Sequence, residues 1–119
     1  MRYLMLIYGD EQAAMQRSEE QQHASYAAWM QYDQEIRAAG VTTAGEALQP
    51  TGTATTVADG GGDPLVTDGP FAETREQLGG YYVLDVPDLD EAIKWAHKCA
   101  AATDTVKLEL RPIMEFDQG

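Results

Sequence analysis

The side chains in this sequence with the clearest chemical potential gather in one segment. Asp68 opens an Asp-Gly-Pro turn, and Glu73 and Arg75 follow within a few residues. A carboxylate at the rim of a cleft can act as a general base or bind a cationic group. An arginine beside it can bind a carboxylate or phosphate through two hydrogen bonds. A structural interpretation stands beside this one, because tight turns select Asp and Gly and exposed ion pairs contribute only about 0–1 kcal/mol each.

Two further residues are candidates for acid–base chemistry. Glu46 lies in a predicted strand and is either an exposed edge residue or a cleft residue. Paired with Asp68, it would form an acid–base couple if their environments separate the two pKa values. His23 lies at the boundary of the apolar side of a predicted helix, where a histidine is either solvated or able to reach a cleft.

Arg111 and Tyr81 are candidates for ligand binding. Arg111 alternates with the inward-pointing Leu110, so it meets either an anionic ligand or the solvent at a sheet edge. Tyr81 and Tyr82 are adjacent in a predicted strand and point to opposite faces of the sheet. One of these tyrosines therefore lines the face that the helices do not cover.

The sequence predicts no metal site and no cofactor. Two isolated histidines without suitably spaced Cys, Asp or Glu do not form a metal site. The glycines at 60–62 lack the spacing of a phosphate-binding loop. Cys99 lies on the apolar side of a predicted helix, which favours a buried and inert thiol.

Four main strands are predicted to position these residues. Residues 3–8 and 80–86 are apolar without alternation, which indicates strands covered on both faces. Residues 41–48 and 106–114 are the other two predicted strands, and the first half of 106–114 alternates between apolar and charged residues. Between them, residues 53–58 and 65–67 predict an inserted hairpin that turns at the glycines.

Two helices connect these strands. Ser18 and Gln21 have capping-box spacing, and the helix that they begin runs to about Ala39, with Gly40 as its left-handed C-terminal cap. A second helix begins after Asp88. Residues 9–17 are predicted to be a loop.

The element order predicts one domain, residues 1–119, with an α+β fold of the ferredoxin-like type, βαβ(β-hairpin)βαβ. Such a fold places the first and third main strands at the centre of the sheet and both helices on one face. The two doubly apolar strands are the ones that this topology makes central. Their second apolar face needs a cover, and a second copy of the chain is the simplest one. We therefore expect a homodimer with a polar-rimmed pocket between the facing sheets.

The charge of the chain excludes several classes of partner. Eight Lys and Arg against 20 Asp and Glu give a formal charge of −12, which repels nucleic acids and anionic lipid surfaces. The N-terminal apolar run is too short for a membrane span and lacks the layout of a signal peptide. We expect a cytoplasmic protein that binds neither nucleic acid nor membrane.

Asp68, Gly69, Pro70 and Phe71 form a DGPF motif, and its setting (VTDGPFAETREQLGGYYVLDV) resembles the YCII-related, DGPF-containing family. The opening YLMLIYGDE and the closing VKLELRPIMEF resemble it too. The resemblance implies a dimeric α/β barrel, and some members of the family are associated with extracytoplasmic-function sigma factors. Related YCII-type proteins have a His–Asp pair in the dimer cleft, but the position of that histidine falls near Trp29 here.

Two functions remain open. One is a ligand-binding or regulatory module that binds a small polar molecule and acts with a regulatory protein partner. The other is a cofactor-free enzyme that performs acid–base chemistry on a small polar metabolite, with Asp68 as the base. The sequence favours the first, because the position expected for a catalytic histidine holds a tryptophan.

Overall fold

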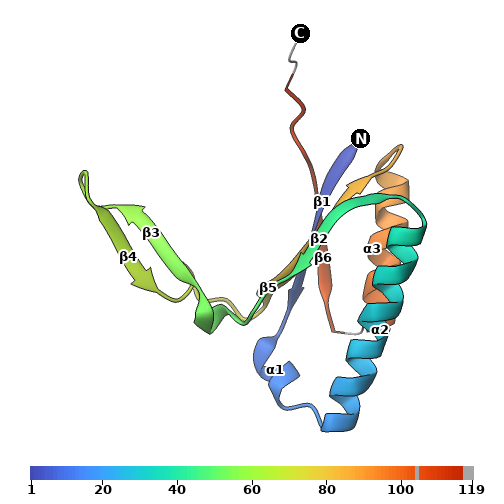
Figure 1. Ribbon diagram of the computed structural model, residues 1–119, viewed down its shortest axis with the longest axis horizontal. Helices are drawn as coiled ribbons and strands as arrows, with labels where there is room; N and C mark the ends of the chain where they lie inside the picture. The colour runs from blue at the N-terminus through green and yellow to red at the C-terminus, as the bar shows by residue number, and fades with distance from the viewer. Residues whose placement is uncertain (104, 117–119) are drawn as a thin grey trace.

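The computed structural model describes residues 1–103 and 105–116 and has an α+β architecture (Figure 1). The strands are β1 (Arg2–Gly9), β2 (Thr42–Ala47), β3 (Thr55–Asp59), β4 (Pro64–Asp68), β5 (Gln77–Asp85) and β6 (Lys107–Pro112). The helices are α1 (Glu11–Met15), α2 (Glu19–Ala38) and α3 (Leu89–Thr103), with a short 3-10 turn at Thr51–Thr53. No helix in the described part of the chain is both long enough and apolar enough to cross a bilayer.

Four of the strands form one antiparallel sheet in the order β2-β5-β1-β6. This is the ferredoxin-like arrangement, and it confirms that the two doubly apolar strands, β1 and β5, are central. Strands β3 and β4 form a separate two-stranded sheet, which confirms the inserted hairpin. The element order, together with the two strands that are apolar on both faces, therefore predicted the sheet order correctly.

Helix α2 begins and ends where its capping residues predict. The Ser18 hydroxyl accepts a hydrogen bond from the Gln21 amide at 3.1 Å, and the Gln21 side chain accepts one from the Ser18 amide at 3.0 Å. This reciprocal pair satisfies two amides that the first helical turn leaves free. At the other end, Gly40 has a φ of 72°, a conformation that glycine adopts at little cost.

One local prediction was wrong. Residues 9–17, expected to be a loop, contain the five-residue helix α1. The Asp10 carboxylate caps this helix by accepting from the Ala13 amide at 3.1 Å. Because α1 has no buried residue, it lacks the apolar periodicity by which helices are recognised in a sequence.

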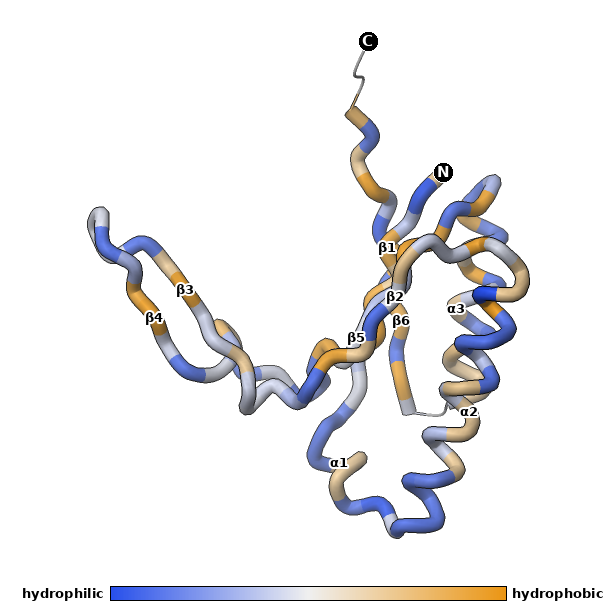
Figure 2. The backbone as a smooth tube through the Cα atoms, viewed as in Figure 1, coloured by the Kyte–Doolittle hydropathy of each residue, from blue (hydrophilic) through white to orange (hydrophobic). Residues whose placement is uncertain are grey.

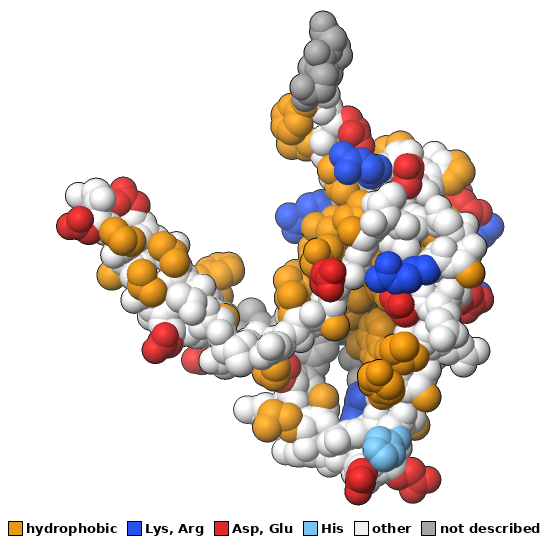
Figure 3. All heavy atoms as spheres, viewed as in Figure 1, with side chains coloured by type: hydrophobic (Ala, Val, Ile, Leu, Met, Phe, Trp, Pro, Cys, Tyr) orange, Lys and Arg blue, Asp and Glu red, His pale blue; other side chains and the backbone are white. Residues whose placement is uncertain are grey.

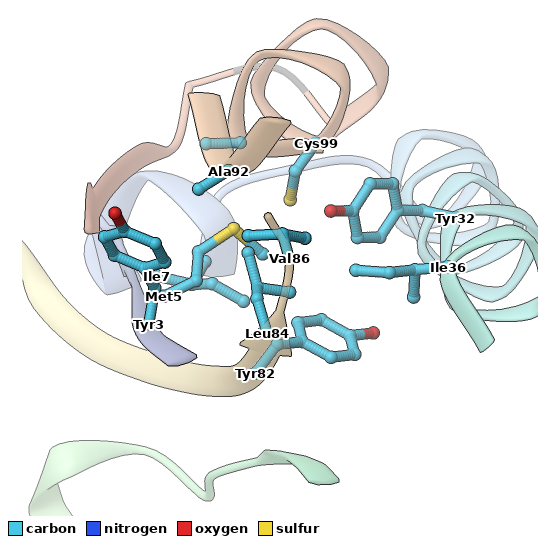
Figure 4. Close-up of a cluster of buried hydrophobic side chains, with 11 residues drawn as sticks. Tyr3, Met5, Ile7, Tyr32, Ile36, Tyr82, Leu84, Val86, Ala92 and Cys99 are labelled. Atoms are coloured by element: carbon cyan, nitrogen blue, oxygen red, sulfur yellow. The ribbon is translucent and has the colours of Figure 1, made fainter. Parts of the chain in front are cut away.

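The core lies between the sheet and the two long helices. Side chains from β1 and β5 point toward α2 and α3 in Figure 4, which places both helices on one face of the sheet. The buried set is Tyr3, Met5, Ile7, Tyr32, Ile36, Tyr82, Leu84, Val86, Ala92, Ala96 and Cys99. Cys99 is fully buried, which confirms its expected place in the core, and burial raises the pKa of its thiol to about 12.

The opposite face of the sheet, called here the open face, is not covered by any helix of the described residues. Its central side chains are half-buried and largely apolar: Leu4, Leu6, Tyr8, Tyr81 and Val83. Tyr81 lies on this face because its neighbour Tyr82 is in the core. Both long helices lie on one side of the sheet in Figure 1, and the β3–β4 hairpin, called here the arm, extends on the other side.

Candidate functional site

A groove of about 670 Å³ lies between α2 and the sheet. Tyr26, Trp29 and Met30 of α2 form an apolar wall, and Ile7 of β1 and Ala14 of α1 contribute further apolar surface. Figure 3 shows the hollow between the α1 region and α2. Concave, mostly apolar surfaces with a few polar groups are typical ligand sites, so this groove is the candidate site.

Three side chains from two elements form a polar network in the groove. The Tyr82 hydroxyl on β5 donates to Asp33 Oδ1 at 2.6 Å, and Arg37 Nε, one turn along α2, donates to Asp33 Oδ2 at 2.9 Å. Arg37 Nη2 also donates to the Gly45 carbonyl on β2 at 3.3 Å. Because each oxygen of the carboxylate already accepts one strong hydrogen bond, Asp33 is fixed in position.

These contacts set the protonation states of the network. The pKa of Asp33 is lowered, and the hydrogen bond from Tyr82 is the largest cause; partial burial opposes it, and the hydrogen bond and charge of Arg37 lower it further. Burial raises the pKa of Tyr82, and its bond to the Asp33 carboxylate raises it further. At neutral pH the groove therefore contains an ionised Asp33 and a neutral Tyr82.

The position of Tyr82 depends on a glycine in the neighbouring strand. Tyr82 pairs with Gly45, and a Cβ atom at position 45 would lie 2.4 Å from Tyr82 Cδ1. Only glycine leaves room for the ring to lie on β2 there. On its other side, the ring meets Tyr32 edge-on, with centroids 5.9 Å apart.

The other end of the groove is lined by α1, which is hydrogen-bonded to β5 and to the segment that leads into the arm. The Glu11 amide donates to Gln77 Oε1 at 2.9 Å. The Glu11 carboxylate accepts from the Thr51 amide at 2.9 Å and from its hydroxyl at 2.8 Å. Arg17 lines the same end and donates to Ser25 at 3.2 Å and to Thr105 at 2.9 Å. Helix α1 is thus tied to both β5 and the root of the arm.

Of the residues selected from the sequence, Glu46 is the one that lines this groove. It is exposed and lies opposite Tyr81 across the β2–β5 pair, so the register places its side chain on the open face, and Glu46 borders the groove through its place on β2. Asp68 lies at the end of β4, on the arm, and is exposed. Within the described residues, no hydrogen bond or ion pair joins these two carboxylates. Their pairing in a dimer cleft stays a prediction.

The turn at Asp68 differs from the one expected. An Asp in such a turn normally accepts from the amide two residues on, but that residue is Pro70, which has no N–H. The turn is instead held by Gly69, whose amide donates to Ala54 O at 2.7 Å and whose carbonyl accepts from Thr56 Oγ1 at 2.7 Å. Gly69 has a φ of 95°, as the Asp-Gly-Pro sequence predicts.

The remaining candidates are exposed and dispersed. His23 lies on the N-terminal half of α2, and Glu73 and Arg75 lie in the segment between the arm and β5. Arg111 lies on β6 and donates to Glu109 in the same strand at 2.8 Å. In the part of the chain that the structure describes, no group of three or more His, Cys, Asp or Glu side chains is arranged to hold a metal ion.

Sequence reasoning missed the three residues of the polar network. Asp33 and Arg37 carry a detectable signal, because an acid and a base four residues apart face each other on a helix. Such pairs are frequent on solvent-exposed helix faces, so the spacing alone does not mark a site. The third member, Tyr82, joins them only through the strand register.

Comparison with known proteins identifies the family. A family model, the YCII-related domain, matches residues 1–117. The chain belongs to the YCII-related family. It is 34% identical over 120 residues to "Uncharacterized protein R00369" of Rhizobium meliloti (strain 1021), a match that covers 100% of this chain and 97% of that protein. The family resemblance drawn from the sequence is therefore confirmed.

Proposed function

We propose that this YCII-related protein binds a small amphipathic molecule in the groove between α2 and the sheet. The observation that supports this proposal is the position of one ionised carboxylate, Asp33, beside an apolar wall formed by Tyr26, Trp29 and Met30. The wall favours an apolar or aromatic body through burial. The carboxylate favours a group that can donate a hydrogen bond.

The charges around the groove narrow the class of ligand further. Asp10, Glu11 and Asp33 line it together with two cations, Arg17 and Arg37. Because Arg37 is already paired with Asp33, the Asp33 end does not attract a second anion. We therefore expect a neutral or cationic ligand with a hydroxyl or amine at its polar end.

Binding accounts for the groove better than catalysis does. A carboxylate with a lowered pKa is a weak general base, and the raised pKa of Tyr82 makes its phenol a weak acid. Asp68 and His23, the sequence-based candidates for a base, do not line this groove. A regulatory role is compatible with ligand binding, and a protein partner, such as a sigma factor, stays a prediction from the family resemblance.

The proposal is tested with probes that differ only in their polar group: phenethylamine, phenethyl alcohol and phenylacetate. We expect the amine and the alcohol to raise the melting temperature and change the fluorescence of Trp29, and the carboxylate to do so least. Trp29→Phe removes the fluorescence response while Trp95, outside the groove, still reports folding. Asp33→Asn should abolish the preference for the amine over the carboxylate.

Two results would contradict the proposal. The absence of any melting shift with all three probes at millimolar concentration would argue against a ligand groove of this class. Tightest binding of phenylacetate would show that the polar end recognises anions. If Asp33→Asn does not fold, Tyr82→Phe serves in its place, because it removes one of the bonds that orient the carboxylate.

A further inference from the structure

Arg17 is a cation of the groove to which the binding proposed above assigns no role. It lies in the turn between α1 and α2, and its side chain is half-buried among the residues that line the groove. Six of the eight lysines and arginines form ion pairs with carboxylates in the described part of the chain. Arg17 and Arg75 are the two that do not, although acidic residues far outnumber basic ones. Of these two, only Arg17 lines the groove.

Two neutral hydroxyl groups hold the guanidinium of Arg17. Nη1 donates to Ser25 Oγ on α2 at 3.2 Å, and Nη2 donates to Thr105 Oγ1 at 2.9 Å. The backbone of Arg17 is held as well, because its carbonyl accepts from Gln22 Nε2 at 3.3 Å. A guanidinium has about five N–H donors, so donors remain for another acceptor. The side chain is thus positioned before a ligand binds, which lowers the entropic cost of binding.

One of the two hydroxyl groups belongs to a residue with a strained backbone. Thr105 has a φ of 61°, a left-handed conformation that β-branched residues rarely adopt. It is the only residue other than glycine with a positive φ among the described residues. Backbone strain of this kind is concentrated at functional sites. Its occurrence beside Arg17 supports a functional role for this end of the groove.

Arg17 and Asp33 lie at opposite ends of the groove. Ser25, which holds Arg17, precedes Asp33 by eight residues on α2, a separation of about 12 Å along the helix axis. The apolar wall lies between these two points. Figure 2 shows the hydrophilic corner between α1 and α2 and the more hydrophobic turns of α2 that follow it. The groove therefore presents a cation at one end, an anion at the other and apolar surface between them.

We propose that the groove binds a bifunctional ligand, with a hydrogen-bond donor at Asp33, an apolar body along the wall and a carboxylate at Arg17. The inference rests on the binding at Asp33 proposed above and adds a second polar end to the ligand. Arginine binds carboxylates through two parallel hydrogen bonds. The distance between the two ends makes the length of the apolar body part of the specificity.

The acidic residues at the Arg17 end favour a carboxylate over a phosphate. Asp10 caps α1, and Glu11 accepts two hydrogen bonds from Thr51, so neither is engaged with Arg17. Their negative charges still act on an incoming anion. A phosphate group, with more than one negative charge at neutral pH, is repelled more strongly than a singly charged carboxylate.

Isothermal titration calorimetry compares two probes that differ only in the carboxylate, ω-aminooctanoate and octylamine. The extended chain of ω-aminooctanoate is comparable in length to the separation of the two ends. We expect the wild-type protein to bind ω-aminooctanoate about tenfold more tightly than octylamine, the gain for hydrogen bonds between charged groups. Octanoate, which lacks the amine, should bind more weakly than ω-aminooctanoate.

Variants of Arg17 assign this gain to one side chain. Arg17→Gln should remove the gain and leave the affinity for octylamine little changed, because octylamine does not reach Arg17 with a polar group. Arg17→Lys should keep part of the gain, because the charge remains. Arg75→Gln is the matched control, since it removes the same charge from an exposed residue outside the groove. It should keep the full gain.

The outcomes separate this proposal from the binding at Asp33. A wild-type protein that binds octylamine, but binds ω-aminooctanoate no more tightly, overturns the bifunctional ligand and leaves the Asp33 site intact. A gain that persists in Arg17→Gln, or that Arg75→Gln also loses, overturns it as well. If neither probe binds, the proposed function fails and this proposal fails with it. If Arg17→Gln does not fold, Arg17→Lys and the wild-type comparison still decide the outcome.

Discussion

Asp33 is held by donors from a strand and from its own helix, with only 32% of its side chain exposed. A hydroxyl–carboxylate bond of 2.6 Å, between Tyr82 and Asp33, is short and charge-assisted. It joins α2 to β5 at a point where the surrounding side chains are aromatic. The bond therefore contributes to folding as well as to the chemistry of the groove.

Removal of the Tyr82 hydroxyl should weaken this connection. We expect Tyr82→Phe to lower the free energy of unfolding by about 1 kcal/mol, less than the roughly 1.5–3 kcal/mol of a buried hydrogen bond to a charged group, because Asp33 is partly solvated. Urea denaturation measures the change. Tyr81→Phe, one residue away on the open face, is the matched control. An equal loss in both variants would rule out the bond to Asp33 as the cause.

Gly45 is the second residue whose substitution has a clear consequence. Its Cβ would lie 2.4 Å from the Tyr82 ring, so Gly45→Ala must displace the ring or the strand, at a cost of about 1–3 kcal/mol. Gly52→Ala is the control, because no atom lies within 4 Å of the Cβ built there. Similar urea midpoints for the two variants would mean that the ring moves at little cost.

At the scale of elements, the two halves of α2 differ in how many side chains they bury. Its buried residues, Tyr32 and Ile36, lie in its C-terminal half. The N-terminal half carries Gln22, Ser25 and Tyr26 along the groove. The capping box at Ser18 is therefore a local stabiliser of the N-terminal half, where no side chain is buried.

Loss of the cap should loosen that half selectively. Ser18→Ala removes an acceptor worth about 1 kcal/mol, and we expect faster hydrogen exchange at residues 19–26 than in wild type, with residues 32–38 little changed. Ser18→Thr keeps a hydroxyl at the cap and should behave like wild type. Uniform acceleration along the helix would show that α2 opens as one unit.

The sequence predicted the elements more completely than the site. Apolar runs located β1 and β5, and the capping signals at Ser18–Gln21 and Gly40 located both ends of α2. Both kinds of signal can be read from the sequence because they depend on residues that are neighbours in the chain. Helix α1 was missed because it buries nothing. The Asp33–Tyr82 contact depends on a pairing between residues 49 positions apart, which no local pattern contains.

At the scale of the whole molecule, several buried groups release protons less readily when the chain is folded. Burial is the largest cause of the raised pKa values of Tyr32, Tyr82 and Cys99. A group with a raised pKa stabilises the fold below its unfolded value, and the stabilisation is lost as the pH rises above it. The ordinary values here are 9.0 for Cys99 and 10.0 for the tyrosines.

We therefore expect stability to fall with increasing pH above about 9. Melting temperatures between neutral pH and pH 11 would measure the decrease, with phenolate absorbance as a second signal. Tyr32→Phe should make the decrease shallower, although it also lowers stability at neutral pH by removing the bond to the Trp95 carbonyl. A melting temperature independent of pH in this range would contradict the expectation.

The single cysteine can report how fast the core of the molecule opens. Cys99 lies in the core with no exposed surface, so a thiol reagent can modify it only when α3 separates from the sheet. The rate at which a thiol reagent labels Cys99 in native buffer would therefore measure the rate of that opening, without an engineered probe. For the same reason, a covalent disulfide-linked pair in a stored sample would mark molecules that had opened, and would be chemically distinct from any association of folded chains.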